Sequence, residues 1–263
     1  MSLNKEKNNI NEYYFGENYR TYVGPPERHD YMGSNQFRLL TALGLRSKHK
    51  LLDFGCGSLR AGKLFIPFLD KYNYFGQEPN QWLIENAIKY EIGKDLIDLT
   101  KPKFSNVDNF ELGFKEKFDY IIANSIFSHC SRKYLIKGIK SIYDGLNENG
   151  IAVITIFEGD EDYVGSKDWV YPDCTLYTKK TISNTLNENI KYWKQLYWFH
   201  PCQSWFILTK SKNKLPSFLK NFFLLGGEEI NSSMFPYNNF LRNRLRKYTN
   251  LKKFFKNFLI NRY

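Results

Sequence analysis

Apolar and polar positions follow two patterns along most of the chain. Short apolar runs that end at polar or glycine residues predict buried strands, and apolar residues three or four positions apart predict helices with one buried face. The predicted strands span residues 51–54, 72–77, 103–107, 118–124, 150–157, 191–199 and 203–210. The predicted helices span residues 35–43, 59–68, 80–90, 132–143 and 180–186. Strands that alternate with helices indicate an α/β fold with a mostly parallel sheet and helices on both faces.

The last two predicted strands, 191–199 and 203–210, are separated by only three residues. Parallel neighbours need a connection of roughly a dozen residues or more, so these two strands must pair in antiparallel fashion. The sequence therefore predicts a seven-stranded sheet that ends in a C-terminal antiparallel hairpin.

The first 210 residues divide into a polar leader and a domain with the strand and helix pattern. Residues 1–34 are polar and rich in tyrosine, and they are expected to form an irregular leader. Residues 35–210 form the predicted α/β domain, and Ser34 is expected to cap its first helix. Residues 91–102 have no clear pattern and are expected to be a plain connection.

The basic charge is concentrated at the C-terminal end of the chain. The net charge is +11, yet residues 210–263 hold 12 basic and two acidic side chains, whereas residues 1–209 hold 26 and 25. Residues 211–263 are therefore a basic extension, and apolar residues at three- and four-residue steps within 240–259 predict an amphipathic helix. Such a helix can lie on an anionic membrane surface, dock on a partner enzyme or nucleic acid, or pack against the domain. The nearly neutral remainder offers no track of charge for phosphates, which makes nucleic acid an unfavoured partner.

Composition and cysteine use narrow the class of protein further. With 42% hydrophobic and 17% aromatic residues, the chain can bury a large core, which excludes a disordered protein. No apolar run reaches the ~20 residues of a membrane span, and the N-terminus lacks the apolar stretch of a signal peptide. The four cysteines show no paired spacing and are expected to be reduced thiols. We therefore expect a cytoplasmic protein, with peripheral attachment to the inner membrane face as an alternative.

A glycine-rich turn carries the clearest chemical signal. The strand 51–54 is followed by Gly55, Cys56 and Gly57 and then by a predicted helix. Glycines let a ligand approach the backbone, and a helix N-terminus offers free N–H groups. A dinucleotide fingerprint would have a third glycine where Arg60 stands, and a P-loop would have Gly-Lys followed by Ser or Thr, a triplet that is missing here.

Five motifs in order resemble those of the class I S-adenosylmethionine-dependent methyltransferases. They are residues 51–57 (apolar, apolar, acid, any, Gly, any, Gly), Glu78 after the next strand, Phe118 and Asp119 at the start of the fourth, the loop 124–127 after it, and the polar turn 147–150. The resemblance covers about residues 34–210 and implies a Rossmann-like fold and an enzyme. It also implies S-adenosylmethionine as the methyl donor, S-adenosylhomocysteine as the product, and a leader that covers the active site. Leu59 departs from the glycine that many members have, and residues 58–62 resemble a subgroup that methylates sugars or secondary metabolites.

The resemblance also implies which residues bind the cofactor. They are Asp53, Gly55, Cys56, Gly57, Arg60, Glu78, Asp108, Asn109, Asn124 and Phe127. Glu78 would accept hydrogen bonds from both ribose hydroxyls. Asp108 would contact the adenine amino group, with Asn109 as its competitor. Arg60 could instead pair with a substrate phosphate or be solvated, and Phe127 could equally be a core residue.

Methyl transfer to oxygen needs a general base beside the acceptor. Ligands of open α/β sheets bind beyond the carboxyl ends of the strands, where His129 and His200 are both expected. His129 is the preferred base and His200 the second, and acids within 158–162 are alternatives in a loop, 158–177, that could form a lid. The expected substrate residues are Tyr22, His29, Tyr31, Glu158, Tyr163, Trp198 and Gln203. No metal site is expected.

The loop after the fourth strand bears on the acceptor. DNA amino-methyltransferases carry two prolines there and cytosine enzymes a Pro-Cys pair, and residues 124–127 have neither. The sequence therefore predicts O-methylation of a sugar, a surface-glycan precursor or another small metabolite by direct displacement with a general base. An RNA or protein methyltransferase recruited through the basic extension, or a non-catalytic cofactor-binding or scaffold protein, remains an alternative. The acceptor, the methylated atom and the oligomeric state stay open.

Overall fold

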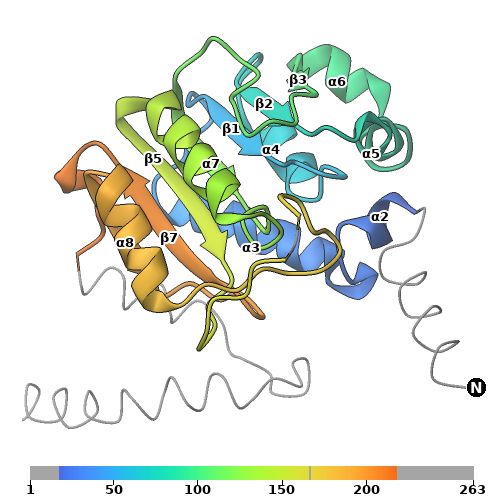
Figure 1. Cartoon of the computed structure of the whole chain (residues 1–263). Helices are drawn as coiled ribbons and strands as arrows, with labels where there is room; N and C mark the ends of the chain where they lie inside the picture. The colour runs from blue at the N-terminus through green and yellow to red at the C-terminus, as the bar shows by residue number, and fades with distance from the viewer. Residues whose placement is uncertain (1–17, 166, 218–263) are drawn as a thin grey trace, which may run out of the picture. The chain divides into compact units, whose positions relative to one another are not determined.

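The computed structural model describes residues 18–165 and 167–217, and within them one seven-stranded sheet forms the centre of the fold (Figure 1). The strand order is β3-β2-β1-β4-β5-β7-β6. The strands are β1 (Leu51–Phe54), β2 (Tyr74–Gln77), β3 (Lys103–Ser105), β4 (Phe118–Ala123), β5 (Leu146–Ile156), β6 (Tyr192–Leu196) and β7 (Ser204–Thr209). Strands β1 to β5 pair in parallel, and β7 lies antiparallel between β5 and β6. The predicted fold class, including its C-terminal hairpin, is confirmed.

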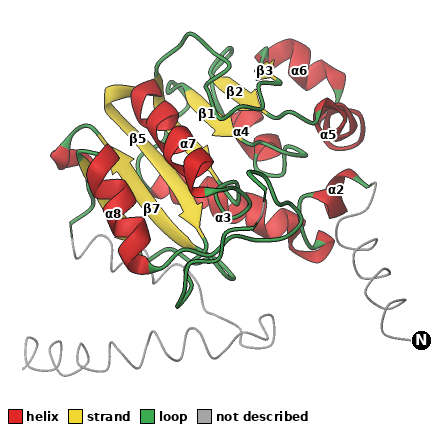
Figure 2. Ribbon diagram, viewed as in Figure 1, coloured by secondary structure: helices red, strands yellow, loops and turns green. Residues whose placement is uncertain are grey.

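Helices cover both faces of this sheet (Figure 2). They are α2 (Tyr19–Tyr22), η1 (Pro26–Arg28), α3 (His29–Ala42), α4 (Gly62–Phe68), α5 (Gln81–Ala87), the π-helix η2 (Ile88–Ile92), α6 (Lys94–Thr100), α7 (Arg132–Gly145), α8 (Lys179–Asn189) and η3 (Lys212–Lys214). Successive strand residues face opposite sides, so Leu51 packs with α3 and α4 in one buried cluster. Leu52 packs with α7 and α8 in the other. The chain thus forms the helix–sheet–helix layers that its alternating pattern predicted.

The parallel register brings the carboxyl ends of β1, β2 and β4 to one edge of the sheet. Leu51 pairs with both Tyr74 and Tyr120, so the three strands end close together. Strand β7 runs the other way and begins at this edge, where Ser204 pairs with Ile156 of β5. The turns that follow β1, β2, β4 and β6 therefore meet in one place.

The start of the chain is more ordered than the sequence pattern predicted. Helix α3 begins at His29, so Ser34 lies inside it and donates its hydroxyl to the Tyr31 carbonyl at 3.0 Å, and the expected Ser34 cap is wrong. The described part of the leader contains α2 and η1 and is not irregular. The early start went unnoticed because polar side chains such as His29 and Asn35 are buried on this helix, which hides its apolar face.

Other boundaries also differ from the prediction. Helix α4 begins at Gly62 and not at residue 59, and the expected connection 91–102 contains part of η2 and all of α6. Helix α6 was missed because only Leu96 and Ile97 pack on the core, and they are partly buried. The amphipathic helix predicted for 240–259 lies outside the described residues and stays a prediction. Within the described ranges, we find no helix with the length and apolar character that spanning a membrane requires.

Candidate functional site

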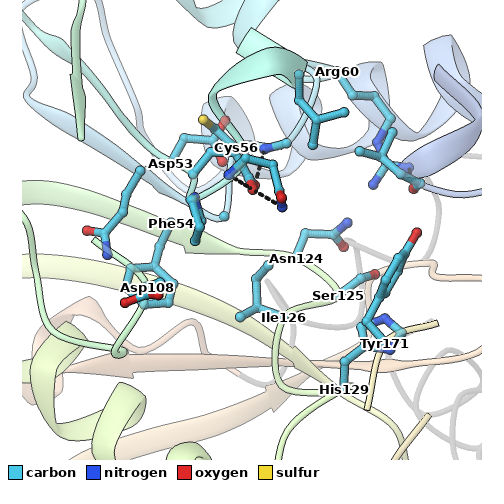
Figure 3. A pocket seen from close by; sticks show the side chains of 18 of the residues that line it. Asp53, Phe54, Cys56, Arg60, Asp108, Asn124, Ser125, Ile126, His129 and Tyr171 are labelled. Atoms are coloured by element: carbon cyan, nitrogen blue, oxygen red, sulfur yellow. Dashed lines mark hydrogen bonds between the residues drawn. The ribbon is translucent and has the colours of Figure 1, made fainter. Parts of the chain in front are cut away.

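A cavity of about 520 Å³ opens at the carboxyl edge of the sheet (Figure 3). Its floor is the glycine-rich turn after β1, and its sides come from the ends of β2 and β4. The segment 107–110 closes one flank, and the loop after β5 contributes Trp169 and Tyr171. Tyr22 and Val23, which follow from α2, complete the wall. Six segments distant in sequence thus converge on one space.

The glycine-rich turn needs its glycines for two separate reasons. Gly55 and Gly57 have φ values of +76° and +54°, in the left-handed region that favours glycine. A Cβ on Gly55 would also lie 2.1 Å from Cδ1 of Ile126. Leu59 shares the left-handed conformation, with φ +53°, while its side chain is fully buried in the core. A side chain rarely adopts this backbone conformation, which glycine adopts freely.

Two buried carboxyls flank the turn. Asp53 accepts a hydrogen bond from the Tyr74 hydroxyl at 2.9 Å, and burial raises the pKa of Asp53 to about 7. Glu78 accepts the Gly57 N–H at 3.1 Å on one oxygen, and the backbone and side-chain N–H groups of Asn80, both at 2.9 Å, on the other. Burial raises the pKa of Glu78, while these hydrogen bonds oppose the rise. Glu78 therefore joins the turn after β1 to the segment after β2.

Arg60 places a buried cation in the cavity wall. Its Nη1 donates to the Val23 carbonyl at 3.2 Å. Burial lowers the pKa of Arg60 to about 10, against the opposing field of Asp53. Among the residues described, no carboxylate forms an ion pair with Arg60, so its guanidinium can receive an anionic group of a ligand.

His129 follows β4 and is oriented by the loop after β5. Its Nδ1 lies 2.7 Å from the Asp173 carbonyl, which can only accept, so Nδ1 carries the proton and Nε2 keeps a lone pair. Burial lowers the pKa of His129, which keeps the ring neutral near pH 7. The ring lines the cavity next to both Trp169 and Tyr171, at centroid distances of 5.9 and 4.9 Å. A neutral imidazole with a free lone pair is the form that a general base requires.

His200 has the opposite arrangement. Its Nδ1 accepts the backbone N–H groups of Cys202 at 3.3 Å and Gln203 at 3.0 Å, so the ring proton lies on Nε2. Burial lowers the pKa of His200 to about 3, and its side chain is not part of the cavity lining. With its lone pair already used, His200 is not arranged as a base. The expectation that placed it at the carboxyl edge did hold, because β6 runs parallel to β5.

The cavity brings together most of the expected cofactor residues and few of the expected substrate residues. It is lined by Asp53, Gly55, Cys56, Gly57, Arg60, Glu78, Asp108, Asn124, His129 and Tyr22. Outside the lining lie Asn109, Phe127, His200, His29, Tyr31, Glu158, Tyr163, Trp198 and Gln203. Phe127 is fully buried in the core beneath α7, and Asn109 accepts the Glu111 N–H in a turn.

The expected substrate residues outside the lining have structural contacts instead. His29 is buried, with Nε2 at 3.1 Å from the Ser58 hydroxyl behind the glycine-rich turn. Glu158 accepts a hydrogen bond from Gln195, and Gln203 donates to the Ser125 hydroxyl at 3.0 Å. Gln203 thus acts on the wall through Ser125, whose backbone is in the left-handed region at φ +60°.

An ionic cluster holds α2 beside this site. Glu91 of η2 accepts from Arg20 at 2.8 Å and from Lys63 at 2.6 Å, and Lys63 also pairs with Asp30. His29, Asp30 and Glu91 lie close enough to hold a metal ion. The two cations already neutralise both carboxylates, so the cluster serves as a tie between α2, α3, α4 and η2.

Two further wall residues are Trp169, which the sequence placed in the expected lid loop, and Tyr171, which sequence reasoning did not single out. Both lie in the loop expected to form a lid, and Tyr171 donates its hydroxyl to the Tyr22 carbonyl across the cavity mouth. The signal that could have found Tyr171 is its place two residues after Trp169 in that loop.

Comparison with known proteins identifies a methyltransferase domain in the chain. Residues 52–152 match a family model for a methyltransferase domain. No curated protein matches the chain by sequence.

Three solved structures illustrate the likeness in fold. The glycopeptide N-methyltransferase MtfA has a TM-score of 0.52 at 10% identity, over 68% of this chain and 90% of that one. The magnesium protoporphyrin IX methyltransferase ChlM from Synechocystis PCC 6803 with bound S-adenosylmethionine has a TM-score of 0.53 at 14% identity, over 80% and 92%. An S-adenosylmethionine-dependent methyltransferase from Clostridium acetobutylicum ATCC 824 has a TM-score of 0.50 at 14% identity, over 80% and 100%. At identities of 10–14%, these structures show a shared fold and nothing further.

Proposed function

Because the chain is a class I S-adenosylmethionine-dependent methyltransferase, we propose that it methylates a hydroxyl oxygen of a sugar, a surface-glycan precursor or another small metabolite. S-adenosylmethionine is the cofactor and S-adenosylhomocysteine the product. The family makes the chain an enzyme, which sets aside the non-catalytic alternative. Its structural neighbours include enzymes named for a glycopeptide and for a magnesium porphyrin, so the acceptor has to be argued from the site itself.

The cavity residues fit the cofactor. The carboxamide of Asn124 is 8% exposed, and neither its oxygen nor its nitrogen has a partner within the described chain. A buried polar group in this state requires a ligand or water. Around it, Gly55 and Gly57 leave the backbone bare, Glu78 presents two carboxylate oxygens that suit the ribose hydroxyls, and Arg60 suits the carboxylate of the methionine end.

His129 is the observation that carries the proposal. When bound, the cofactor would supply a methyl group on a positively charged sulfur, and an oxygen lone pair could attack the methyl carbon with the neutral sulfide as the leaving group. Nε2 of His129 takes the hydroxyl proton as the new C–O bond forms, and the sulfur keeps the electron pair of the bond that breaks. The Asp173 carbonyl, already bonded to Nδ1–H at 2.7 Å, stabilises the resulting imidazolium until its proton passes to water. An amine acceptor needs such a base less, since its uncharged form attacks without prior loss of a proton.

The test replaces His129 with glutamine, which keeps a hydrogen-bonding side chain but removes the base. His49→Gln is the matched control, because His49 lies before β1 at the opposite end of the sheet. We expect S-adenosylhomocysteine to bind the wild type and both variants alike in calorimetry. Methyl transfer to a panel of sugars and small hydroxylated metabolites should fall by about 10²- to 10⁴-fold in His129→Gln only. Equal turnover by His129→Gln and wild type would refute His129 as the base.

A further inference from the structure

One tryptophan of the cavity wall is unusually exposed. Trp169 has an exposed fraction of 44%, whereas the other four tryptophans are buried or half-buried. Large apolar side chains exposed at a cavity are typical of surfaces that bind something. Trp169 lies at the mouth of the cavity, next to the proposed base.

The backbone that carries Trp169 is held firmly in place. Trp169 forms a β-bridge with Cys130, and the Val170 N–H donates to the His129 carbonyl at 2.9 Å. The Thr175 N–H donates to the Ser128 carbonyl at 2.7 Å on the same side. The backbone of Trp169 is therefore fixed relative to that of His129 before any ligand arrives, which lowers the cost of ordering this segment on binding.

Trp169 and Tyr171 together form a continuous aromatic wall. Their rings are 6.4 Å apart and inclined by only 24°. Trp169 also meets Phe110, at 6.1 Å, on its other side. The His129 ring is inclined to them by 60° and 78°, at centroid distances of 5.9 and 4.9 Å, so the imidazole lies beside this wall.

This geometry restricts the shape of the acceptor. A hydroxyl that gives its proton to Nε2 must lie within about 3 Å of that atom. The carbon framework that carries the hydroxyl must then lie against Trp169 and Tyr171. Aromatic faces attract the C–H groups of a saturated ring and the face of an aromatic ring, whereas a flexible open chain covers them poorly.

We propose that Trp169, with Tyr171 beside it, is the surface that binds the ring bearing the reacting hydroxyl, so that the acceptor is a hydroxylated ring and not an open-chain alcohol. This inference rests on the proposed transfer to a hydroxyl. The ring can be a saturated sugar or a phenol, and both present the chemistry that the wall recognises.

The experiment measures binding and not turnover. Protein saturated with S-adenosylhomocysteine is titrated with methyl pyranosides, with catechol and with the open-chain polyol sorbitol, and followed by saturation-transfer NMR. The variants are Trp169→Ala and Trp169→Phe, with Tyr163→Ala as the matched control. Tyr163 is an exposed aromatic residue of the same loop, with an exposed fraction of 59%, but it does not line the cavity.

We expect at least one ring-bearing probe to bind the wild type and sorbitol to bind at least about tenfold more weakly. Trp169→Ala should weaken the ring-bearing probe about tenfold, while Trp169→Phe and Tyr163→Ala stay within about threefold of the wild type. Binding of pyranosides identifies a sugar site, and binding of catechol a phenol site. The affinity for S-adenosylhomocysteine should be unchanged throughout.

Three results would overturn the inference. The first is that no ring-bearing probe binds the wild type, and the second is that Trp169→Ala binds the probe as tightly as the wild type does. The third is that Trp169→Ala loses as much affinity for S-adenosylhomocysteine as it loses for the ring-bearing probe. The proposed function fails separately. If His129→Gln retains full methyl transfer, His129 is not the base, yet the ring-binding result stands on its own measurement.

Discussion

Leu59 offers a sharp test of how backbone strain and burial compete in the glycine-rich turn. Its backbone is left-handed, which costs a residue with a side chain about 1–2 kcal/mol, while its side chain is fully buried. Removing the side chain beyond Cβ in Leu59→Ala keeps the strain and leaves a cavity, so the free energy of unfolding should fall by about 2–5 kcal/mol. Leu59→Gly leaves a similar cavity but relieves the strain. We therefore expect Leu59→Gly to be more stable than Leu59→Ala by about 1 kcal/mol.

Leu52 provides the matched control for this comparison. It is also fully buried, but it lies in strand β1 and is not among the residues with a positive φ. There glycine should be less stable than alanine by about 0.5–1 kcal/mol, the reverse order. Urea unfolding followed by tryptophan fluorescence gives the four values. If glycine is no more stable than alanine at position 59, the left-handed strain does not govern this turn.

Further predictions concern the cofactor, pH and the C-terminal extension. Glu78→Gln keeps the size of the side chain but removes its charge, and it should weaken S-adenosylhomocysteine binding about tenfold or more in calorimetry, with Glu116→Gln, at a surface ion pair, as the control. Asp53 has a pKa of about 7 in the folded chain, above its ordinary 3.8. Its contribution to stability is therefore full below pH ~4 and is lost as the pH rises to 7. The urea midpoints of unfolding at pH 5 and pH 8 should differ less in Asp53→Asn than in the wild type. We propose that residues 240–259 attach the enzyme to anionic membranes; replacing Arg242, Arg244 and Arg246 with glutamine should then reduce co-sedimentation with anionic vesicles and leave cofactor affinity unchanged. Unchanged sedimentation would refute that role.

The sequence predicted the parts of the fold that local patterns determine. The run 51–54 and the short link between the last two strands sufficed for β1 and for the hairpin. Helix α6 escaped because its few apolar residues pack at the margin of the core, and the start of α3 escaped because the helix buries the polar residues His29, Asn35 and Gln36.

The candidate site divides in a similar way. The glycine-rich turn and Glu78 were predictable, because their roles depend on backbone shape and on the position after a strand. The difference between His129 and His200 was not, since it depends on which ring nitrogen is occupied by Asp173 or by the backbone of 202–203. Such tautomers are set by partners that the chain brings together only when folded.

The ionic cluster around Glu91 has a consequence for how fast ligands leave the cavity. One wall of the cavity, the loop with Trp169, is fastened to the rest of the domain by backbone hydrogen bonds, which salt hardly affects. The other wall, α2, is held by ion pairs among Arg20, Lys63, Asp30 and Glu91, whose side chains are 37%, 20%, 67% and 8% exposed, and by hydrogen bonds from Arg60 and Tyr171 to backbone carbonyls. Exposed charge pairs weaken as ionic strength rises. If these ion pairs limit release from the side of α2, dissociation of S-adenosylhomocysteine should become faster with added salt, and a rate that salt does not change would refute this.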